Sequence, residues 1–214
     1  MEAEHVIRTK ESNLRLFVSG SLAGFLIGIG STVMKSVNDP VAGALLFCIG
    51  LYSIVYLHLH LFTGKIGGII SDAVSDDDLR VSAKLLRYAI IFLGNFVGAY
   101  LCATLISCAF PQIASSCLNS CTKYVSENMC EALLFGAMCG VLMEIAVSLK
   151  GLAIFLCVPA FILSGYEHSI AEMFYFSAAH MITAQSICHI LLVGFGNAIG
   201  AILIHEALHF INRR

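Results

Sequence analysis

Charged residues are scarce in this sequence. Asp, Glu, Lys and Arg together make up 12% of the 214 residues, and the chain contains three prolines and no tryptophan. Hydrophobic residues make up 58%. A soluble domain of this length would need more polar surface to remain in water. The composition therefore excludes an ordinary soluble domain and indicates an integral membrane protein.

The N-terminal residues lack the pattern of a removable signal peptide. Residues 1–13 are polar and contain no short apolar stretch that ends in a small-residue cleavage site. We expect no signal peptide to be removed, and the first membrane span to direct insertion itself.

Long apolar segments account for most of the chain. A membrane-spanning helix requires about 20 largely apolar residues. Six segments meet this requirement: residues 14–34, 41–62, 86–110, 130–149, 152–176 and 184–211. Little of the chain remains outside them. The sequence therefore predicts one all-α transmembrane domain over residues 1–214, with six transmembrane helices.

Lysine and arginine are unequally divided between the two predicted sides of the membrane. Short cytoplasmic loops collect these residues, and six spans place both termini on one side. Ten positive residues fall on that side: Arg8, Lys10, Arg15, Lys65, Arg80, Lys84, Arg87, Lys150, Arg213 and Arg214. Only Lys35 and Lys123 fall on the other side. We expect a multi-pass protein of the cell (inner) membrane with both termini in the cytoplasm.

The nine cysteines fall into two groups. Five lie inside apolar spans, where a thiol packs as a small hydrophobic side chain: Cys48, Cys102, Cys139, Cys157 and Cys188. Four surround the predicted outward loop between the third and fourth spans: Cys108, Cys117, Cys121 and Cys130. An oxidising compartment would allow one or two disulfides among these four.

A six-residue motif occurs twice at an offset of 102 residues. Residues 94–99 and 196–201 both have the pattern Gly-Asn-x-x-Gly-Ala, and small residues of this kind let helices approach closely. At the same offset, residues 61–64 fall opposite residues 163–166, so each half has a glycine-bearing interruption in its second span.

The repetition predicts the architecture. Three spans in each half give the halves opposite orientations, and inverted repeats with broken helices recur in membrane transport proteins. The free ends of half-helices supply partial charges near the membrane centre. We therefore predict an inverted repeat of three plus three spans, about residues 14–110 and 130–211, with broken second and fifth helices.

Polar residues interrupt the fifth apolar segment. Residues 164–169 have the sequence Ser-Gly-Tyr-Glu-His-Ser, which places a carboxylate and an imidazole inside a segment long enough to cross a bilayer. Ionisable groups at this depth are costly and usually mark a transport path.

These motifs together resemble the formate/nitrite transporter family. The resemblance rests on residues 61–64, on both Gly-Asn-x-x-Gly-Ala motifs and on residues 164–171 with Met173 and Phe174. It implies an aquaporin-like fold and a homopentamer in the lipid membrane with a pore through each subunit. The implied function is a channel or proton-coupled transporter for small monovalent anions. Formate and nitrite are the leading substrates, and hydrosulfide and lactate are alternatives. It implies no enzymatic activity, no cofactor, no metal and no nucleic-acid partner.

The resemblance also assigns roles to pore residues. The family's central pore histidine falls on His168, and the threonine that approaches it at the pore centre falls on Thr63. The apolar constrictions fall on Phe47, Leu51, Leu61, Phe161 and Met143. A basic residue near the outer mouth falls on Lys123, although Glu127 four residues later indicates a solvated ion pair from the sequence alone.

The motif residues have a simple chemical interpretation. We expect Gly64 and Gly165 to permit the helix breaks, and Glu167 to accept hydrogen bonds from exposed backbone N–H groups. An imidazole exchanges a proton near neutral pH, so His168 can hydrogen-bond an entering anion or protonate it. From the sequence alone, a histidine hydrogen-bonded within the helix bundle is the alternative for His168.

Three positions depart from the family pattern. Gly140 and Glu172 stand where members commonly have Asn, and His60 stands where they commonly have Glu. We expect these changes to alter hydrogen bonding and charge near the pore, and hence the substrate rather than the fold.

Two other histidine patterns support competing hypotheses. His205, Glu206 and His209 match H-E-x-x-H, which on a helix suits an intramembrane zinc metalloprotease; the spacing favours no third zinc ligand. A haem or metal protein could instead use intramembrane histidines: His58, His60, His180 and His189. However, no paired helical histidines recur at matching depth.

Overall fold

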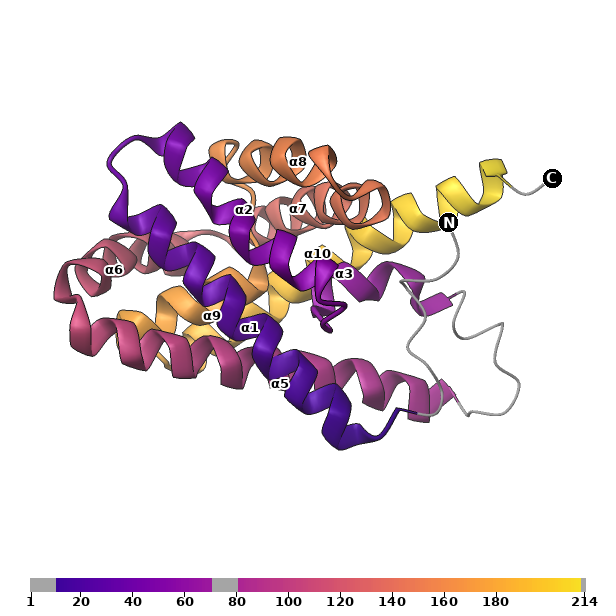
Figure 1. The fold of residues 1–214 in the computed structure, drawn as a ribbon, viewed down its shortest axis with the longest axis horizontal. Coiled ribbons are helices and arrows are strands. Elements are labelled where there is room, and N and C mark those ends of the chain that lie inside the picture. The colour runs from indigo at the N-terminus through magenta and orange to yellow at the C-terminus, as the bar shows by residue number, and fades with distance from the viewer. Residues whose placement is uncertain (1–10, 71–80, 213–214) are drawn as a thin grey trace.

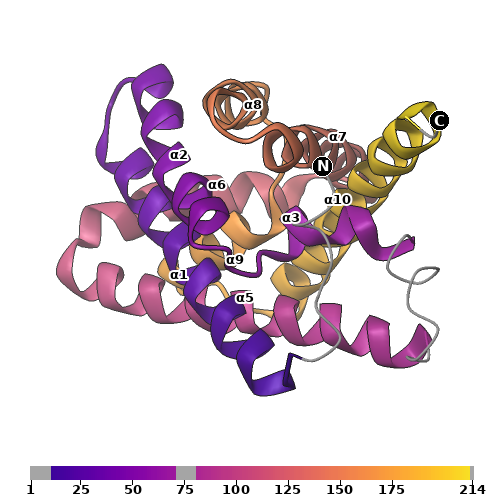
Figure 2. The same cartoon turned by 45° about the vertical axis from the view of Figure 1, so that its right-hand side comes forward.

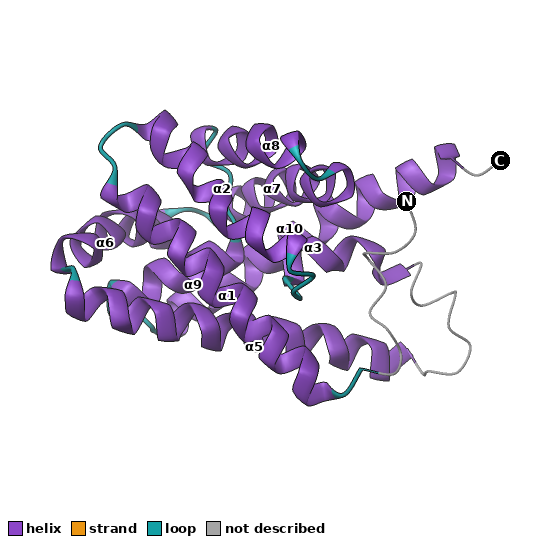
Figure 3. Ribbon diagram, viewed as in Figure 1, coloured by secondary structure: helices purple, strands orange, loops and turns teal. Residues whose placement is uncertain are grey.

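The computed structural model describes residues 11–70 and 81–212, and every regular element within them is a helix (Figure 3). Four helices in the described residues are long and apolar enough to cross a membrane: α1 (Asn13–Ser36), α5 (Val81–Ala109), α7 (Met129–Leu149) and α10 (Ala184–Asn212). They correspond to the first, third, fourth and sixth predicted spans. The positive residues Arg8, Lys10, Arg80, Arg213 and Arg214 lie outside the described residues.

The second and fifth predicted spans are both interrupted. The second consists of α2 (Pro40–Tyr56), a non-helical turn, α3 (Phe62–Lys65) and the short 3-10 helix η1 (Ile66–Gly68). The fifth consists of α8 (Leu152–Leu163), a second turn and α9 (Ser169–Ala178). Figure 1 and Figure 2 both place α3 and α9 near the centre of the molecule, among the long helices.

The predicted outward loop between the third and fourth spans contains an additional helix, α6 (Pro111–Ser126). Pro111 occupies the first turn, where backbone N–H groups have no partner within the helix, so proline's lack of an N–H costs no helical hydrogen bond. Ile113, Cys117 and Cys121 are spaced four residues apart and form the buried face of the helix. The expectation of a polar loop was therefore wrong, and Lys123 lies in the last turn of this helix.

The long helices form two tightly packed parallel pairs, α1 with α5 and α7 with α10. A Cβ atom added at Gly24 or Gly98 would clash with backbone oxygens of the partner helix in the first pair. The same is true of Gly140 and Gly200 in the second pair. Glycine is required at these positions because the helix backbones are in direct contact.

The two pairs run in opposite directions. A hydrophobic cluster joins the N-terminal parts of α1 and α5 to η1 and to the C-terminal half of α10, through Leu16, Tyr88, Ile66 and Ala201. The first pair therefore begins at the end of the molecule where the second pair finishes. At the opposite end, Lys35 Nζ donates a hydrogen bond of 2.7 Å to Ser120 Oγ of α6.

The described positive residues divide between these two ends. Five lie at the end where α1 and α5 begin: Arg15, Lys65, Lys84, Arg87 and Lys150. Lys35 and Lys123 lie at the end where α6 packs. We call the second of these the α6 end. The division matches the charge asymmetry that the sequence predicts.

Candidate functional site

The first helix break is held by the side chain of Asn95 in α5. Asn95 Oδ1 accepts a hydrogen bond of 2.9 Å from the backbone N–H of Phe62, the first residue of α3. Asn95 Nδ2 donates to the carbonyl oxygens of Gly20 at 2.8 Å and His60 at 3.0 Å. Asn95 is completely buried. One side chain thus ties the broken second span to α1 and α5.

Asn197 in α10 holds the second break in the same way. Its Oδ1 accepts a hydrogen bond of 3.0 Å from the backbone N–H of Ser169, the first residue of α9. Its Nδ2 donates to the carbonyl oxygens of Gly136 and Glu167, both at 2.8 Å. Asn197 is also completely buried. The repeated motif therefore supplies a bonding side chain as well as the small residues that the sequence predicted.

The two breaks correspond to each other at an offset of 107 residues, since α3 begins at Phe62 and α9 at Ser169. The expected pairing of residues 61–64 with 163–166 was wrong by five residues. The positive backbone φ angles follow the same correspondence, with 55° at His58 and 74° at Gly165. Gly64 instead lies inside α3. Asn95 lies 35 residues after its partner His60, whereas Asn197 lies 30 residues after its partner Glu167. This difference accounts for the shift of five residues between the two offsets.

His168 and Thr63 meet at the centre of the molecule. His168 Nε2 lies 2.8 Å from Thr63 Oγ1, and His168 Nδ1 accepts a hydrogen bond of 3.2 Å from the backbone N–H of Ala171. An Nδ1 atom that accepts carries no proton, so a neutral ring bears its proton on Nε2 and donates to Thr63. His168 is 3% exposed and Thr63 is fully buried.

A pocket of about 250 Å³ leads to His168 from the α6 end. Lys35 and Lys123 line it, and its walls also include Phe47, Phe161 and His168. The Phe161 ring stacks on the His168 imidazole with centroids 5.8 Å apart, and Phe47 meets Phe161 edge-on at 6.3 Å. Phe161 therefore stacks on the histidine where the pocket ends, and Phe47 packs against Phe161.

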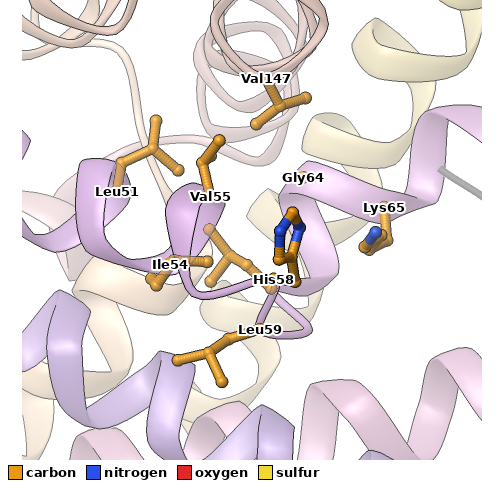
Figure 4. Close-up of a pocket in the computed structure, with 9 residues that line it drawn as sticks. Leu51, Ile54, Val55, His58, Leu59, Gly64, Lys65 and Val147 are labelled. Atoms are coloured by element: carbon orange, nitrogen blue, oxygen red, sulfur yellow. The ribbon is translucent and has the colours of Figure 1, made fainter. Parts of the chain in front are cut away.

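A second pocket, of about 30 Å³, approaches from the opposite end. Leu51 and Leu61 line it together with Gly64, Lys65 and Val147. Figure 4 shows Val147 of α7 close to Gly64 of α3, with His58 below them. The two pockets share no lining residue. Buried apolar side chains and the Thr63 to His168 contact separate them.

The structure brings most of the predicted pore residues to these two pockets. Phe47, Phe161, His168, Lys123 and Gly165 line the larger pocket. Leu51, Leu61 and Gly64 line the smaller one, and Thr63 bonds to His168 between them. Met143 is 1% exposed, packs in the main hydrophobic core and lines neither pocket.

Lys123 also forms the ion pair that its spacing predicts. Its Nζ lies 3.5 Å from Glu127 Oε1, and the Lys123 side chain is 63% exposed. Burial raises the pKa of Glu127 to about 7, and the neighbouring charge of Glu167 acts in the same direction.

Glu167 has different partners from those expected. Among the described residues, no backbone N–H donates to its carboxylate. Its Oε2 lies 3.2 Å from His189 Nε2 of α10, and Glu172 Oε2 lies 3.6 Å from the same nitrogen. Asn197, rather than Glu167, bonds the exposed backbone at this break. Sequence reasoning missed this role of Asn197; the identical position of Asn in the two motifs was the available signal.

The three departures from the family pattern lie in different surroundings. Gly140 lies at the contact between α7 and α10, where a side chain would clash with the Asn197 backbone, so close packing requires glycine here. His60 Nε2 lies 3.2 Å from Glu11 Oε2, and its Nδ1 lies 2.8 Å from Ser19 Oγ. Glu172 lines the larger pocket.

Among the described residues, the histidines of the competing hypotheses do not gather with one another into a metal-binding group. His205 Nδ1 lies 2.8 Å from Glu144 Oε1, and His209 is exposed. Within the described residues, no third His, Cys, Asp or Glu side chain completes a metal-binding group with these two. His58 lines the smaller pocket, whereas His189 lies beside Glu167. The nine cysteines are all free thiols.

We expect Asn197→Ala to unfold the protein at lower temperature, because three buried backbone groups lose their partner. Each unsatisfied group costs about 1–3 kcal/mol, so a loss of about 3 kcal/mol or more should lower the melting midpoint by about 6 °C or more. Size-exclusion chromatography of heated detergent samples measures this midpoint. Asn119→Ala, on the exposed side of α6, is the control and should melt like the wild type. Equal midpoints for the two variants would contradict the bonding role.

Comparisons with known proteins agree with this geometry. A family model described as "Formate/nitrite transporter" matches residues 1–211. The chain is 30% identical to the nitrite transporter NirC of Salmonella typhimurium over 203 residues, which cover 82% of this chain and 72% of that protein. It is 25% identical to the formate channel FocA of Haemophilus influenzae over 183 residues, which cover 74% of this chain but only 64% of that protein.

Solved structures show the same fold. An FNT family ion channel superposes with a TM-score of 0.82 at 24% identity, covering 94% of this chain and 91% of that one. A pentameric formate channel with formate bound superposes with a TM-score of 0.80 at 18% identity, covering 95% and 98%. The matched family contains channels and transporters rather than enzymes, which excludes the protease hypothesis. The chain is an all-helical, multi-pass membrane protein and belongs to the formate/nitrite transporter family.

Proposed function

We propose that this chain forms a channel or proton-coupled transporter for small monovalent anions, with formate or nitrite as the leading substrate and hydrosulfide or lactate as alternatives. The observation that carries the proposal is the buried contact between His168 and Thr63, which lies between two pockets that approach from opposite ends. The names of the relatives, a nitrite transporter and a formate channel, support this substrate class.

The proposed architecture is an aquaporin-like inverted repeat with three spans in each half. The opposite directions of the α1/α5 and α7/α10 pairs support it. The equivalent bonds of Asn95 and Asn197 at the two breaks support it as well. The assembly is a homopentamer with a pore through each subunit, as suggested by the pentameric relative. Both termini are cytoplasmic, because the end of the molecule where α1 begins collects the described Lys and Arg residues.

An anion entering from the α6 end first meets positive charge. Lys35 and Lys123 line the pocket there and raise the local concentration of anions. The aromatic rings beyond them offer no replacement for water, and a bare anion in an apolar site is costly. Passage therefore requires either hydrogen-bond donors or conversion of the anion to its neutral acid.

The tautomer of His168 bears on this choice. The Nε2 proton points to Thr63, so an anion at this position can replace that contact and accept hydrogen bonds from the imidazole and from the hydroxyl. If His168 gave its Nε2 proton to the anion, the ring would have to take up another proton. Its Nδ1 atom is already occupied, because it accepts a hydrogen bond from the backbone N–H of Ala171. We therefore infer that His168 acts first as a hydrogen-bond donor; proton transfer to the anion is the alternative role.

Proteoliposome flux tests the substrate class. Purified protein should conduct formate and nitrite, with hydrosulfide and lactate measured in the same panel. It should exclude divalent sulfate more completely than it excludes chloride-sized strong-acid anions. Protein-free liposomes are the control. If none of the four weak-acid anions crosses faster than in the control, the proposed function is wrong.

Two substitutions of His168 separate hydrogen bonding from proton transfer. His168→Asn keeps an N–H donor but cannot titrate, whereas His168→Ala keeps neither property. If the histidine acts as a donor, we expect His168→Ala to lower flux at least tenfold, since one charge-assisted hydrogen bond contributes about 1.5–3 kcal/mol. His168→Asn should retain most of the flux between pH 5 and 8. An equal loss in both variants would instead support proton transfer, and wild-type flux in both would exclude any role in conduction.

Three apolar residues form the dry constrictions of the proposed pore: Leu51, Leu61 and Phe161. Their replacement by alanine widens and wets the passage, so each variant should increase leak conductance in planar bilayers. Leu105→Ala is the matched control, because Leu105 is exposed on α5 and lines neither pocket. If all three variants conduct like this control, the constrictions lie elsewhere.

A further inference from the structure

Three carboxylates and one imidazole meet beside the larger pocket, and we call this group the Glu/His cluster. Glu127 precedes α7, Glu167 lies in the second break, Glu172 is in the first turn of α9 and His189 is in α10. Ligand-type atoms of Glu127, Glu167 and His189 all lie within 4.8 Å of one another. Three segments far apart in the sequence thus bring ionisable side chains to one point.

Two carboxylates of the cluster are buried, and its acidic groups outnumber their basic partners. Glu167 is 2% exposed and Glu172 is 1% exposed. Glu172 accepts no hydrogen bond from any described residue, and Glu167 shares one with the equally acidic side chain of Glu127. His189 Nε2 faces both carboxylates without a hydrogen bond of good geometry. Buried charges are normally paired or coordinate a metal. Lys123 pairs with Glu127 at 3.5 Å, but the buried carboxylates of Glu167 and Glu172 have only the His189 imidazole as a basic neighbour, which is unfavourable.

The spacing of these atoms suits a tetrahedral metal ion. Zinc binds histidine nitrogen and carboxylate oxygen at about 2.0–2.2 Å, which separates neighbouring tetrahedral ligand atoms by about 3.4 Å. His189 Nε2 lies 3.2 Å from Glu167 Oε2 and 3.6 Å from Glu172 Oε2. Both distances from the His189 nitrogen are therefore already close to those that one zinc ion requires.

The ligand types restrict the choice of metal. An imidazole nitrogen with carboxylate oxygens suits Zn²⁺, whereas Ca²⁺ and Mg²⁺ prefer oxygen ligands alone and Cu⁺ prefers thiolates. We propose that Glu127, Glu167, Glu172 and His189 bind one Zn²⁺ ion per subunit at the wall of the larger pocket. Glu172 lines this pocket, which gives the ion a route to the cluster from the α6 end.

Such an ion would act on the neighbouring histidine as well as on the fold. Glu167 directly precedes His168, and Glu172 lies four residues after it, one turn into α9. Zn²⁺ bound to both would fix the break between α8 and α9 and would neutralise most of the negative charge of the carboxylates beside the pocket. A test of this site is independent of which anion passes, because metal binding is measured without any flux.

The experiment compares zinc binding by the full-length wild type with that of two cluster variants, Glu172→Gln and His189→Gln. Protein stripped with a chelator is dialysed against Zn²⁺ and analysed by mass spectrometry for metal content and by calorimetry for affinity. We expect about one zinc per subunit in the wild type and at least a tenfold loss of affinity in each variant, since even changes outside the ligand set cost 10–100-fold.

His209→Gln is the matched control, because His209 belongs to the other zinc-like motif and is exposed at the end of α10. It should bind zinc like the wild type. X-ray absorption at the zinc edge distinguishes this site from the nine free thiols: nitrogen and oxygen ligands lie at about 2.0–2.2 Å and sulfur at about 2.3 Å. Size-exclusion profiles confirm that each variant is folded.

Several results would overturn the proposal. These are the absence of retained zinc in the wild type, a sulfur shell in the absorption spectrum, undiminished binding by the folded Glu172→Gln and His189→Gln proteins, or loss of binding in His209→Gln.

Discussion

A helix broken inside a membrane leaves backbone N–H and C=O groups that water cannot reach, and all of them need partners within the protein. This constraint governs the centre of the molecule. Asn95 and Asn197 meet it with three hydrogen bonds each. The starting points of α3 and α9 depend on these bonds. The positions of Thr63 and His168, which lie at those starting points, depend on them in turn.

The spans could be predicted from the sequence because long apolar segments have few alternatives in a bilayer. The broken helices could be predicted from the polar and glycine residues inside two such segments. Helix α6 could not, since its apolar face of Ile113, Cys117 and Cys121 is set within a polar stretch that is typical of a loop. The register of the breaks was missed because an alignment anchored on Asn95 and Asn197 ignores the different lengths of chain that precede them.

The functional site around His168 was predictable only in part, because some of its contacts join segments that are far apart in the sequence. His168 and Thr63 could be named from motifs, and their 2.8 Å contact agrees with that prediction. The partner of Glu167 could not be named, because His189 comes from a different helix and no spacing connects the two residues. Gly140 was expected to affect pore chemistry, but the close approach of α10 decides what this position can hold. Contacts between distant segments determined each of these outcomes.

The asparagine bonds have a mechanical consequence. Asn95 bonds to residues of the first three spans, and Asn197 bonds to residues of the last three. Each half therefore satisfies its own interrupted backbone, and the line between the two pockets runs along the seam between the halves. A small sliding of one half against the other would lengthen the Thr63 to His168 hydrogen bond while every asparagine bond stayed intact. The contact between Thr63 and His168 is thus the hydrogen bond at the two breaks that reports such a movement.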